Sequence, residues 1–364
     1  MIRIDDGGCP GKASPVIRSL RLVDFRCFRE LNLDLSGESA VFVGENAQGK
    51  TSLLEAVCVL VRLQSPRTHR LVNLKRFEQQ VFGVAGECWG EQRRVTKDGE
   101  GLGLQVQGEE VTSQGEYLSS GGLLVWMGNE DLELVRGPGE VRRRFLDFAA
   151  GQVDPLYRRH LMRYKRALKA RNFLLKQRVP DEEQISAYTA LLVEHGEVVQ
   201  GIRQSLVESL VKPVTDAQEG VSGKAEEVGI FYKGSGYGAL AEAYASEAER
   251  ERRQGKTVVG PHRDDVHLTL NGRGAAEFGS EGQQRTMALA LKLGQGDLLE
   301  REREIAPVYL IDDVFGELDT GRRNALMEYL PEKSQQLITT TSVAWLGQES
   351  PPLFRVAGGE VVAE

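Results

Sequence analysis

One stretch of the chain combines residue types that bind phosphate. Residues 44–51 fit the pattern G-x-x-x-x-G-K-[ST] in full, between an apolar run at residues 40–43 and the good helix formers that follow. In such a strand, loop and helix, backbone N–H groups and the positive end of the helix surround phosphates. Lys50 adds a charge at the β and γ oxygens, and Thr51 adds a hydroxyl ligand for Mg²⁺. The pattern predicts a nucleotide site formed by Gly44, Glu45, Asn46, Ala47, Gln48, Gly49, Lys50, Thr51 and Ser52.

Two carboxylates follow a second apolar run, residues 308–311. Asp312 ends this predicted strand, and a carboxylate in that place orients Mg²⁺ or its waters beside a glycine loop. Asp313 comes directly after it and is positioned to polarise the attacking water. The sequence therefore predicts Thr51 and Asp312 as metal ligands, and Asp313 and Lys50 as catalytic residues.

The chain before the glycine loop predicts two antiparallel strands, because residues 16–22 and 31–35 alternate apolar and polar side chains. The turn between them places Arg26 near the nucleotide, where a nucleotide contact and a solvated surface arginine are both open interpretations. Short alternating pieces separated by glycines predict an antiparallel meander over residues 80–106. Further strands are predicted at residues 123–127, 266–270 and 337–341.

The composition indicates a globular protein of two domains, or one large core with an insert. The chain has 364 residues and a formal net charge of −7. Its four cysteines show no C-x-x-C pair and no partner histidines at zinc spacing, so a reduced, cytoplasmic protein is expected. No run reaches the length of a membrane span, and residues 1–15 lack the apolar core of a signal peptide. We interpret those residues as a flexible leader.

Positive charge is concentrated in one segment of this acidic chain. Residues 142–178 contain twelve Lys or Arg against two acids, Asp147 and Asp154, so the segment carries +10 and the remainder of the chain −17. Apolar side chains recur through it at helical spacing, from Tyr157 to Leu175. The segment predicts an amphipathic helix with a cationic outer surface.

A second helix is predicted over residues 181–211, where apolar side chains recur at a-like and d-like positions. Pro180 and Pro213 bracket this helix, so we expect it to end there without continuing as an extended coiled coil. His195 lies on its apolar stripe, which favours a core or boundary histidine over a metal ligand. A third helix over residues 237–254 completes the helical insert.

Two segments after this insert resemble functional sites but favour simpler interpretations. Residues 254–257 repeat the Gln-Gly-Lys-Thr of the glycine loop, yet a polar helix precedes them, which indicates a linker. Residues 260–265, Gly-Pro-His-Arg-Asp-Asp, begin a turn. His262, His267 and the two aspartates suggest a metal cluster, but no third histidine or cysteine lies at ligand spacing. A turn rich in hydrogen bonds is therefore predicted.

A capping box begins the helix that is predicted at residues 286–299, because Ser280 is an N-cap candidate and Gln283 lies three residues on. The run Ser-Glu-Gly-Gln-Gln at residues 280–284 also resembles the signature of ABC-type ATPases. Asp312-Asp313 resemble the end of their Walker B strand, and residues 317–319 their D-loop. Together with the short insert and the motifs at residues 65–68, 137–147 and 260–265, these segments resemble the RecF family of bacterial recombination mediators over nearly the whole chain from Ile17.

The resemblance implies an α/β fold: a P-loop ABC-type ATPase head related to SMC heads, with a mixed sheet, an inserted helical lobe and no long coiled coil. The expected domains are an ATPase domain of residues 16–137 and 256–364 and a helical domain of residues 138–255, after the leader of residues 1–15.

The resemblance also implies ATP and Mg²⁺ as cofactors and a head-to-tail homodimer that sandwiches ATP. Ser280, Gly282 and Gln283 would face the γ-phosphate held by the other subunit, and its loss would loosen the dimer. The implied activity is a weak, DNA-stimulated ATPase that acts as a switch. The implied role is in recombinational DNA repair, the SOS response and replication-fork maintenance, where partners of the RecR and RecO type help to load recombinase at gaps.

DNA is implied to bind across the dimer, and the basic segment then supplies phosphate contacts without evident base readout. The predicted DNA-binding residues are Arg142, Arg143, Arg158, Arg159, Arg163, Arg166 and Lys169.

Two other functions within this superfamily are open alternatives. An ABC-type ATPase subunit energises a membrane or other partner complex, but this chain has a basic helical insert and no coupling-helix groove that we can identify. An anti-phage defence ATPase usually carries an extra nuclease domain, for which we expect no room here.

Overall fold

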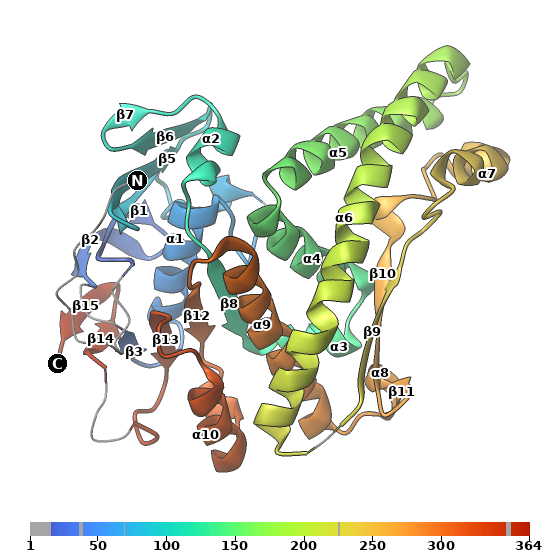
Figure 1. Cartoon of the computed structure of the whole chain (residues 1–364). Helices are drawn as coiled ribbons and strands as arrows, with labels where there is room; N and C mark the ends of the chain where they lie inside the picture. The colour runs from blue at the N-terminus through green and yellow to red at the C-terminus, as the bar shows by residue number, and fades with distance from the viewer. Residues whose placement is uncertain (1–15, 36–38, 69, 225, 347–350) are drawn as a thin grey trace. The chain divides into compact units, whose positions relative to one another are not determined.

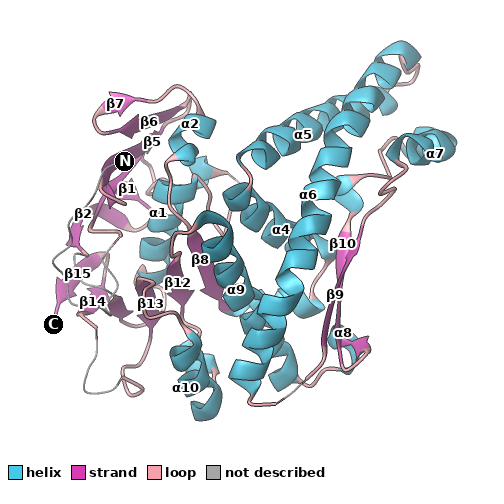
Figure 2. Ribbon diagram, in the orientation of Figure 1, coloured by secondary structure: helices cyan, strands magenta, loops and turns pink. Residues whose placement is uncertain are grey.

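The computed structural model describes residues 16–35, 39–68, 70–224, 226–346 and 351–364 (Figures 1 and 2). The leader predicted over residues 1–15 lies outside them. The chain divides into two compact units, one of Met1–Asn129 with Glu304–Glu364 and one of Glu130–Arg303. Among the described residues, no helix is long and apolar enough to cross a membrane.

The first unit is built on a six-stranded sheet that carries the glycine loop. Five strands run parallel, and the last pairs antiparallel at one edge. Because carboxyl ends of parallel strands meet at one edge of a sheet, the residues that follow these strands gather there. The order is β15 (Glu360–Ala363), β14 (Leu353–Ala357), β3 (Ala40–Val43), β13 (Gln336–Thr340), β12 (Val308–Asp312) and β8 (Leu124–Gly128).

A second sheet of the first unit is antiparallel throughout and confirms the predicted strand pair and meander. Helix α1 (Lys50–Arg62) contacts strands of both sheets, which explains why nearly all of its residues are buried. Two shorter helices, α2 (Gln114–Ser119) and α10 (Thr320–Tyr329), also belong to this unit. The order of strands is β2 (Phe28–Asp34), β1 (Ser19–Phe25), β4 (Phe82–Cys88), β5 (Glu91–Lys97), β6 (Leu102–Val106) and β7 (Glu109–Glu110).

The second unit is mainly helical and includes a small antiparallel sheet. The strands lie in the order β11 (Arg273–Gly274), β10 (Asp265–Leu270) and β9 (Val228–Lys233), and β9 and α9 both pack against α6. By these contacts the second unit spans Glu130–Arg303, whereas the expected helical domain spans residues 138–255. The helices are α3 (Glu133–Arg136), α4 (Gly139–Val153), α5 (Pro155–Leu175), α6 (Glu182–Ser222), α7 (Leu240–Gln254), α8 (Ala275–Phe278) and α9 (Glu281–Arg303).

The basic segment forms two helices, so the prediction of a single helix was wrong. Helix α4 ends at Val153, and Asp154 has extended backbone angles while its carboxylate accepts a hydrogen bond from Leu156 N at 2.7 Å. Pro155 follows as the first residue of α5. An Asp N-cap followed by Pro is a strong helix start, and it interrupts a helical pattern that otherwise continues. Most of the predicted apolar stripe of α5 is buried, including Tyr157, Leu161 and Tyr164.

Helix α6 passes through Pro213, so the predicted end of the second helix was also wrong. The helix runs over 41 residues to Ser222, about 60 Å at 1.5 Å per residue. A proline inside a helix removes one backbone hydrogen bond. Pro213 is itself buried, and buried Val214, Ala217 and Val221 follow it, so packing offsets that loss.

Candidate functional site

The glycine loop joins β3 to α1 and brings its backbone close to neighbouring atoms at two positions. A Cβ at Gly44 would lie 2.2 Å from the carbonyl oxygen of Val356. Gly49 has φ +111° at the N-cap of α1, and its Cβ would lie 2.6 Å from the sulfur of Cys27. Only glycine satisfies both demands, which accounts physically for the two glycines of the motif.

Lys50 lies folded onto the loop that it follows. Its ammonium donates to the carbonyls of Gly44 at 2.7 Å and Glu45 at 2.8 Å. Burial lowers the pKa of Lys50, and the nearby carboxylates of Asp312 and Asp313 oppose that shift. The lysine charge is therefore held over the loop by weak carbonyl partners, which a phosphate can displace.

Thr51 and Asp312 form the predicted pair of oxygen ligands. The Thr51 hydroxyl donates to Asp312 Oδ1 at 2.8 Å, and the Thr339 hydroxyl donates to the same oxygen at 2.7 Å. Strand β13 separates β3 from β12 in the sheet. Thr51 reaches Asp312 because it lies in the first turn of α1, beyond the end of β3. A hydroxyl and a carboxylate are hard ligands that suit Mg²⁺, which keeps most of its shell for phosphate and water.

Asp313 is the carboxylate at this edge that has an unsatisfied hydrogen-bond acceptor among the described residues. Its backbone has φ 53°, and its N–H donates to the carbonyl of Thr339 at 3.1 Å. Its Oδ1 is buried and has no hydrogen-bond partner within the described part of the chain. Burial raises the pKa of Asp313, while the ammonium of Lys50 opposes the rise. A buried acceptor with a raised pKa suits a group that takes a proton.

Asn129 was missed as a member of this edge. It follows β8, the strand beside β12, and its amide donates to the backbone carbonyl of Asp313 at 3.4 Å. No local sequence pattern marks Asn129 as part of the site. The order of strands, which the sequence does not disclose, brings it next to the catalytic candidate.

Arg26 is fastened to a buried carboxylate of α1. Its guanidinium donates to both oxygens of Glu55 at 2.8 Å, and Glu55 is fully buried. The Ser65 hydroxyl also donates to Glu55, at 2.5 Å, and a nitrogen of Arg67 lies 4.0 Å from it. Glu55 thus connects the turn after β1 with residues 65–67. The signal for Glu55 was a single acid within the otherwise apolar residues 53–61 of the helix.

The signature-like residues lie in the second unit, and the predicted capping box is present. Ser280 N donates to Gln283 Oε1 at 2.9 Å, and Gln283 N donates to Ser280 Oγ at 3.3 Å. Ser280 is exposed at the start of α9, together with the preceding Phe278. The Gln283 amide also donates to Glu226 at 2.9 Å. Gly282 lies between these residues in the first turn of the helix.

The predicted DNA-binding residues fall into two structural groups. Arg142 binds both oxygens of Asp265, at 2.7 and 3.0 Å, and Arg143 donates to the carbonyl of Asp264 at 2.6 Å. Arg158 is partly buried, and burial lowers its pKa. Of the predicted DNA-binding residues, the exposed ones all lie on α5: Arg159, Arg163, Arg166 and Lys169. We call these four the α5 basic surface.

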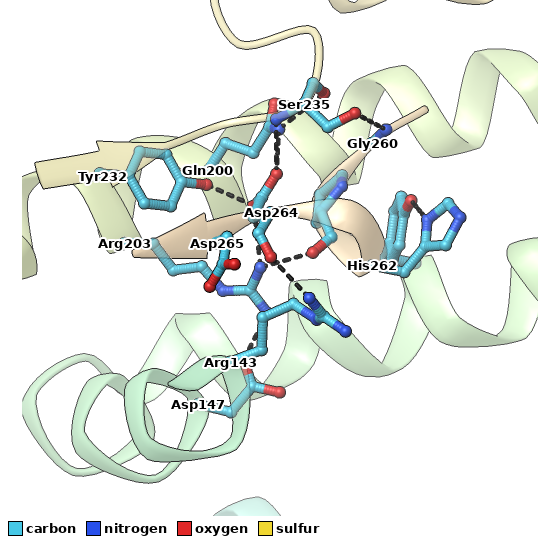
Figure 3. A network of polar contacts seen from close by, with 12 residues as sticks. Arg143, Asp147, Gln200, Arg203, Tyr232, Ser235, Gly260, His262, Asp264 and Asp265 are labelled. Atoms are coloured by element: carbon cyan, nitrogen blue, oxygen red, sulfur yellow. Dashed lines mark hydrogen bonds and ion pairs between the residues drawn. The ribbon is translucent and has the colours of Figure 1, made fainter. Parts of the chain in front are cut away.

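The turn at residues 260–265 is the centre of a buried polar network (Figure 3). Both oxygens of Asp264 are satisfied, Oδ1 by Gln200 and the N–H of Ser235, and Oδ2 by Arg203 and Tyr232. The prediction of a turn rich in hydrogen bonds is therefore confirmed. Among the described residues, no group of three or more His, Cys, Asp or Glu is arranged to hold a metal ion.

Arg203 extends this network toward α4 and α5. Its guanidinium donates to Asp264 at 2.9 Å, to Asp147 at 2.6 Å and to the hydroxyl of Tyr157 at 3.0 Å. Lys165, on α5, donates to the other oxygen of Asp147 at 3.3 Å. We call Asp147, Gln200, Arg203, Tyr232 and Asp264 the Asp264 network.

Comparisons with known proteins cover nearly the whole chain. A family model described as an AAA domain matches residues 19–113. The DNA replication and repair protein RecF of Oceanobacillus iheyensis is 34% identical, with 95% of this chain and 99% of that protein covered. The RecF protein of Exiguobacterium sp. is 33% identical, with 96% and 99% covered.

Solved structures agree with the sequence comparisons. A structure of the recombination mediator protein RecF with ATP, in the RecFOR pathway, matches with a TM-score of 0.86 at 27% identity, covering 98% of this chain and 99% of that chain. An Smc head bound to the C-winged helix domain of ScpA matches with a TM-score of 0.54 at 14% identity, which supports the fold alone. The predicted ATPase-head fold is thus confirmed.

Proposed function

The chain belongs to the RecF family of DNA replication and repair proteins, and from this premise we propose that it is an ATP-dependent DNA-binding switch of recombinational repair. The observation that carries the proposal is the pairing of Thr51 with Asp312 beside Asp313, whose buried Oδ1 is unpaired among the described residues. This arrangement provides two oxygen ligands and one proton acceptor at the end of the glycine loop.

The roles of the residues follow from their chemistry. The loop N–H groups and Lys50 hold the phosphates of ATP. Thr51 and Asp312 would hold Mg²⁺, which supplies charge neutralisation at the phosphates when bound. Asp313 orients the attacking water and accepts its proton, a task that the raised pKa of its carboxylate favours.

ATP binding completes a head-to-tail dimer in this proposal. The oxygen of Ser280 accepts a hydrogen bond from Gln283 N, so its hydroxyl proton is free to be donated outward to the γ-phosphate held by a second copy. The positive end of the 23-residue helix α9 supports the same negative charge. ATP hydrolysis removes the contact with the γ-phosphate and loosens the dimer. A slow hydrolysis rate therefore keeps the dimer assembled for long, which suits a switch.

DNA binding is assigned to the α5 basic surface. We expect these four exposed cations to contact DNA phosphates, with a strong dependence of binding on salt. Arg142 and Arg143 take part in internal ion pairs and hydrogen bonds, and we assign them a supporting role. Partners of the RecR and RecO type complete the proposed pathway.

Sedimentation with and without ATP tests the proposal. We expect ATP to promote a dimer, DNA to strengthen it, and Ser280→Arg to abolish it while ATP binding persists. Lys50→Met should remove ATP binding, because the loop loses its one positively charged side chain. Equal monomer fractions with and without ATP would contradict the proposed switch.

A charge reversal tests the DNA assignment separately. Arg159→Glu, Arg163→Glu and Arg166→Glu together should weaken DNA binding and flatten its dependence on salt, since about three phosphate contacts are lost. The measurement is a salt titration of affinity on a panel of duplex, single-stranded and junction DNA. An unchanged salt slope would place the DNA elsewhere.

A further inference from the structure

Glu226 holds the turn that presents Ser280. Its Oε1 accepts a hydrogen bond from the Gln283 amide at 2.9 Å, and its Oε2 accepts one from the Gln218 amide at 2.6 Å. Gln283 in turn accepts from Ser280 N at 2.9 Å. Four side chains or backbone groups therefore form one continuous chain of hydrogen bonds. We call Gln218, Glu226 and Gln283 the signature relay.

A second set of bonds fixes the other side of the same turn. The Gln284 amide nitrogen lies within hydrogen-bond distance of the carbonyls of Ala275 at 3.2 Å, Ala276 at 3.0 Å and Gly279 at 3.1 Å. A Cβ at Gly279 would lie 2.6 Å from the carbonyl oxygen of Ala275. This side is held within residues 275–284 themselves. The relay, by contrast, ties the turn to a distant element.

That distant element is α6. Gln218 is fully buried on α6, near its end, and Gly294 of α9 packs so closely that its Cβ would lie 2.9 Å from Val214 N. The same helix carries Gln200 and Arg203 of the Asp264 network, and it packs against α5. Helix α6 thus packs against α5, which carries the basic surface, and is linked to the signature turn through Glu226.

We propose that the signature relay positions the Ser280 hydroxyl for the γ-phosphate of a second copy, with Glu226 as its central residue. This inference rests on the proposed ATP-sandwich dimer. A carboxylate that accepts from two amides fixes both of their orientations, because each amide must turn its NH₂ toward the acid. The Gln283 oxygen is thereby turned toward Ser280 N. Glu226 acts through this turn and touches no nucleotide in the proposal.

The relay also connects α6 with Ser280, the residue that would contact the nucleotide of the second copy. A small rotation or shift of α6 that moves Gln218 changes the angle at which Ser280 is presented. DNA that binds the α5 basic surface would exert force on α5, and α5 packs against α6. The contacts therefore run from α5 through α6 and the relay to the turn that presents Ser280.

Glu226→Ala tests the relay, and Glu227→Ala is its matched control. Glu227 is the next residue, has the same charge and is exposed. We expect Glu226→Ala to weaken ATP-dependent dimerisation about tenfold or more, since two charged hydrogen bonds are lost. Its binding of fluorescent ATP, measured under monomeric conditions, should stay within about twofold. Glu227→Ala should behave like the unmodified chain in both assays. Dimerisation of Glu226→Ala at the unmodified affinity would overturn the proposal.

A double-mutant cycle separates positioning from general destabilisation. If Glu226 acts through Gln283, Gln283→Ala alone and the combination with Glu226→Ala should weaken dimerisation to the same extent. Additive losses would overturn the relay. Glu226→Gln keeps one acceptor oxygen and should restore part of the affinity, and thermal melts of each variant check that the chain is folded.

Ser280→Arg, measured beside these variants, distinguishes failure of the relay from failure of the proposed ATP-sandwich dimer. If Ser280→Arg abolishes the ATP-dependent dimer and Glu226→Ala does not affect it, the relay is wrong and the sandwich stands. If Ser280→Arg dimerises with ATP like the unmodified chain, the sandwich itself is wrong, and the relay fails with it.

Discussion

The polar edge of the first unit and the Asp264 network of the second differ in how far their carboxylates are satisfied. Asp264 receives a donor on each oxygen, as does Asp147, all from groups of the second unit. At the ATP edge, Asp313 Oδ1 is buried without a partner among the described residues, and Lys50 contacts only carbonyls of its own loop there. Both clusters are charged and largely buried. The saturated one holds the fold, and the unsaturated one is available for chemistry.

The largest effect is expected from breaking the saturated cluster. Arg203→Met leaves Asp147 and Asp264 buried with fewer donors, so the free energy of unfolding should fall by about 3–5 kcal/mol. Denaturant titration monitored by circular dichroism measures it. Arg159→Met, an exposed arginine on α5, is the matched control and should change stability by less than about 0.5 kcal/mol. A loss for Arg203→Met no larger than the control would show that the network is not structural.

The unsaturated cluster should respond in activity rather than stability. Asp313→Asn removes the proton acceptor, so steady-state ATP hydrolysis should fall by about 10²–10⁴-fold. ATP binding and the melting temperature should change little, because the carboxylate satisfies no donor with the buried oxygen. Glu328→Gln, which replaces an exposed acid on α10, is the control. Hydrolysis that persists in Asp313→Asn would assign the base elsewhere.

A smaller effect is expected in the pH dependence of stability, through His262 in the turn that contains Asp264. His262 accepts from the Tyr164 hydroxyl at 2.7 Å, and its other ring nitrogen lies 3.1 Å from the carbonyl of Thr257, so the neutral ring fits. Burial lowers the pKa of His262 to about 4, whereas an unfolded histidine titrates near about 6.5. Between these values the unfolded chain binds more protons, so the free energy of unfolding falls as the pH is lowered through this window.

His262→Gln tests this linkage. The unmodified chain should lose about 2 kcal/mol between pH 7 and pH 5 through this one group, and the variant should lack that part of the slope. His267→Gln, which replaces an exposed histidine, should keep the slope. Identical pH profiles for His262→Gln and the unmodified chain would show that His262 is not buried neutral.

The two clusters also differ in how far the sequence predicted them. The glycine loop, the carboxylates at residues 312 and 313 and the Ser280 capping box are local patterns, in which neighbours along the chain set the chemistry. The Asp264 network is not local: Arg203 meets Asp147 across 56 positions and Asp264 across 61. Its turn was predicted, but its partners were not, because no short-range pattern encodes them.

The remaining errors have the same origin. Pro213 predicted the end of a helix from local rules, but tertiary packing carries α6 on to Ser222. Glu226 and Asn129 gave no signal, since their roles depend on which strand or helix lies beside them. Arg26 was left open between a nucleotide contact and a surface residue, and its ion pair with Glu55 is a third arrangement.

The central claim, that each ATP site is shared by two copies, is tested most directly by mixing two inactive chains. Lys50→Met lacks the phosphate-binding charge, and Ser280→Arg lacks the complementary signature. In a mixed head-to-tail dimer, one site combines the intact loop of the Ser280→Arg chain with the intact signature of the Lys50→Met chain. We predict that the mixture regains ATP hydrolysis, up to about one quarter of the unmodified rate with random pairing. A mixture as inactive as either chain alone would contradict the account.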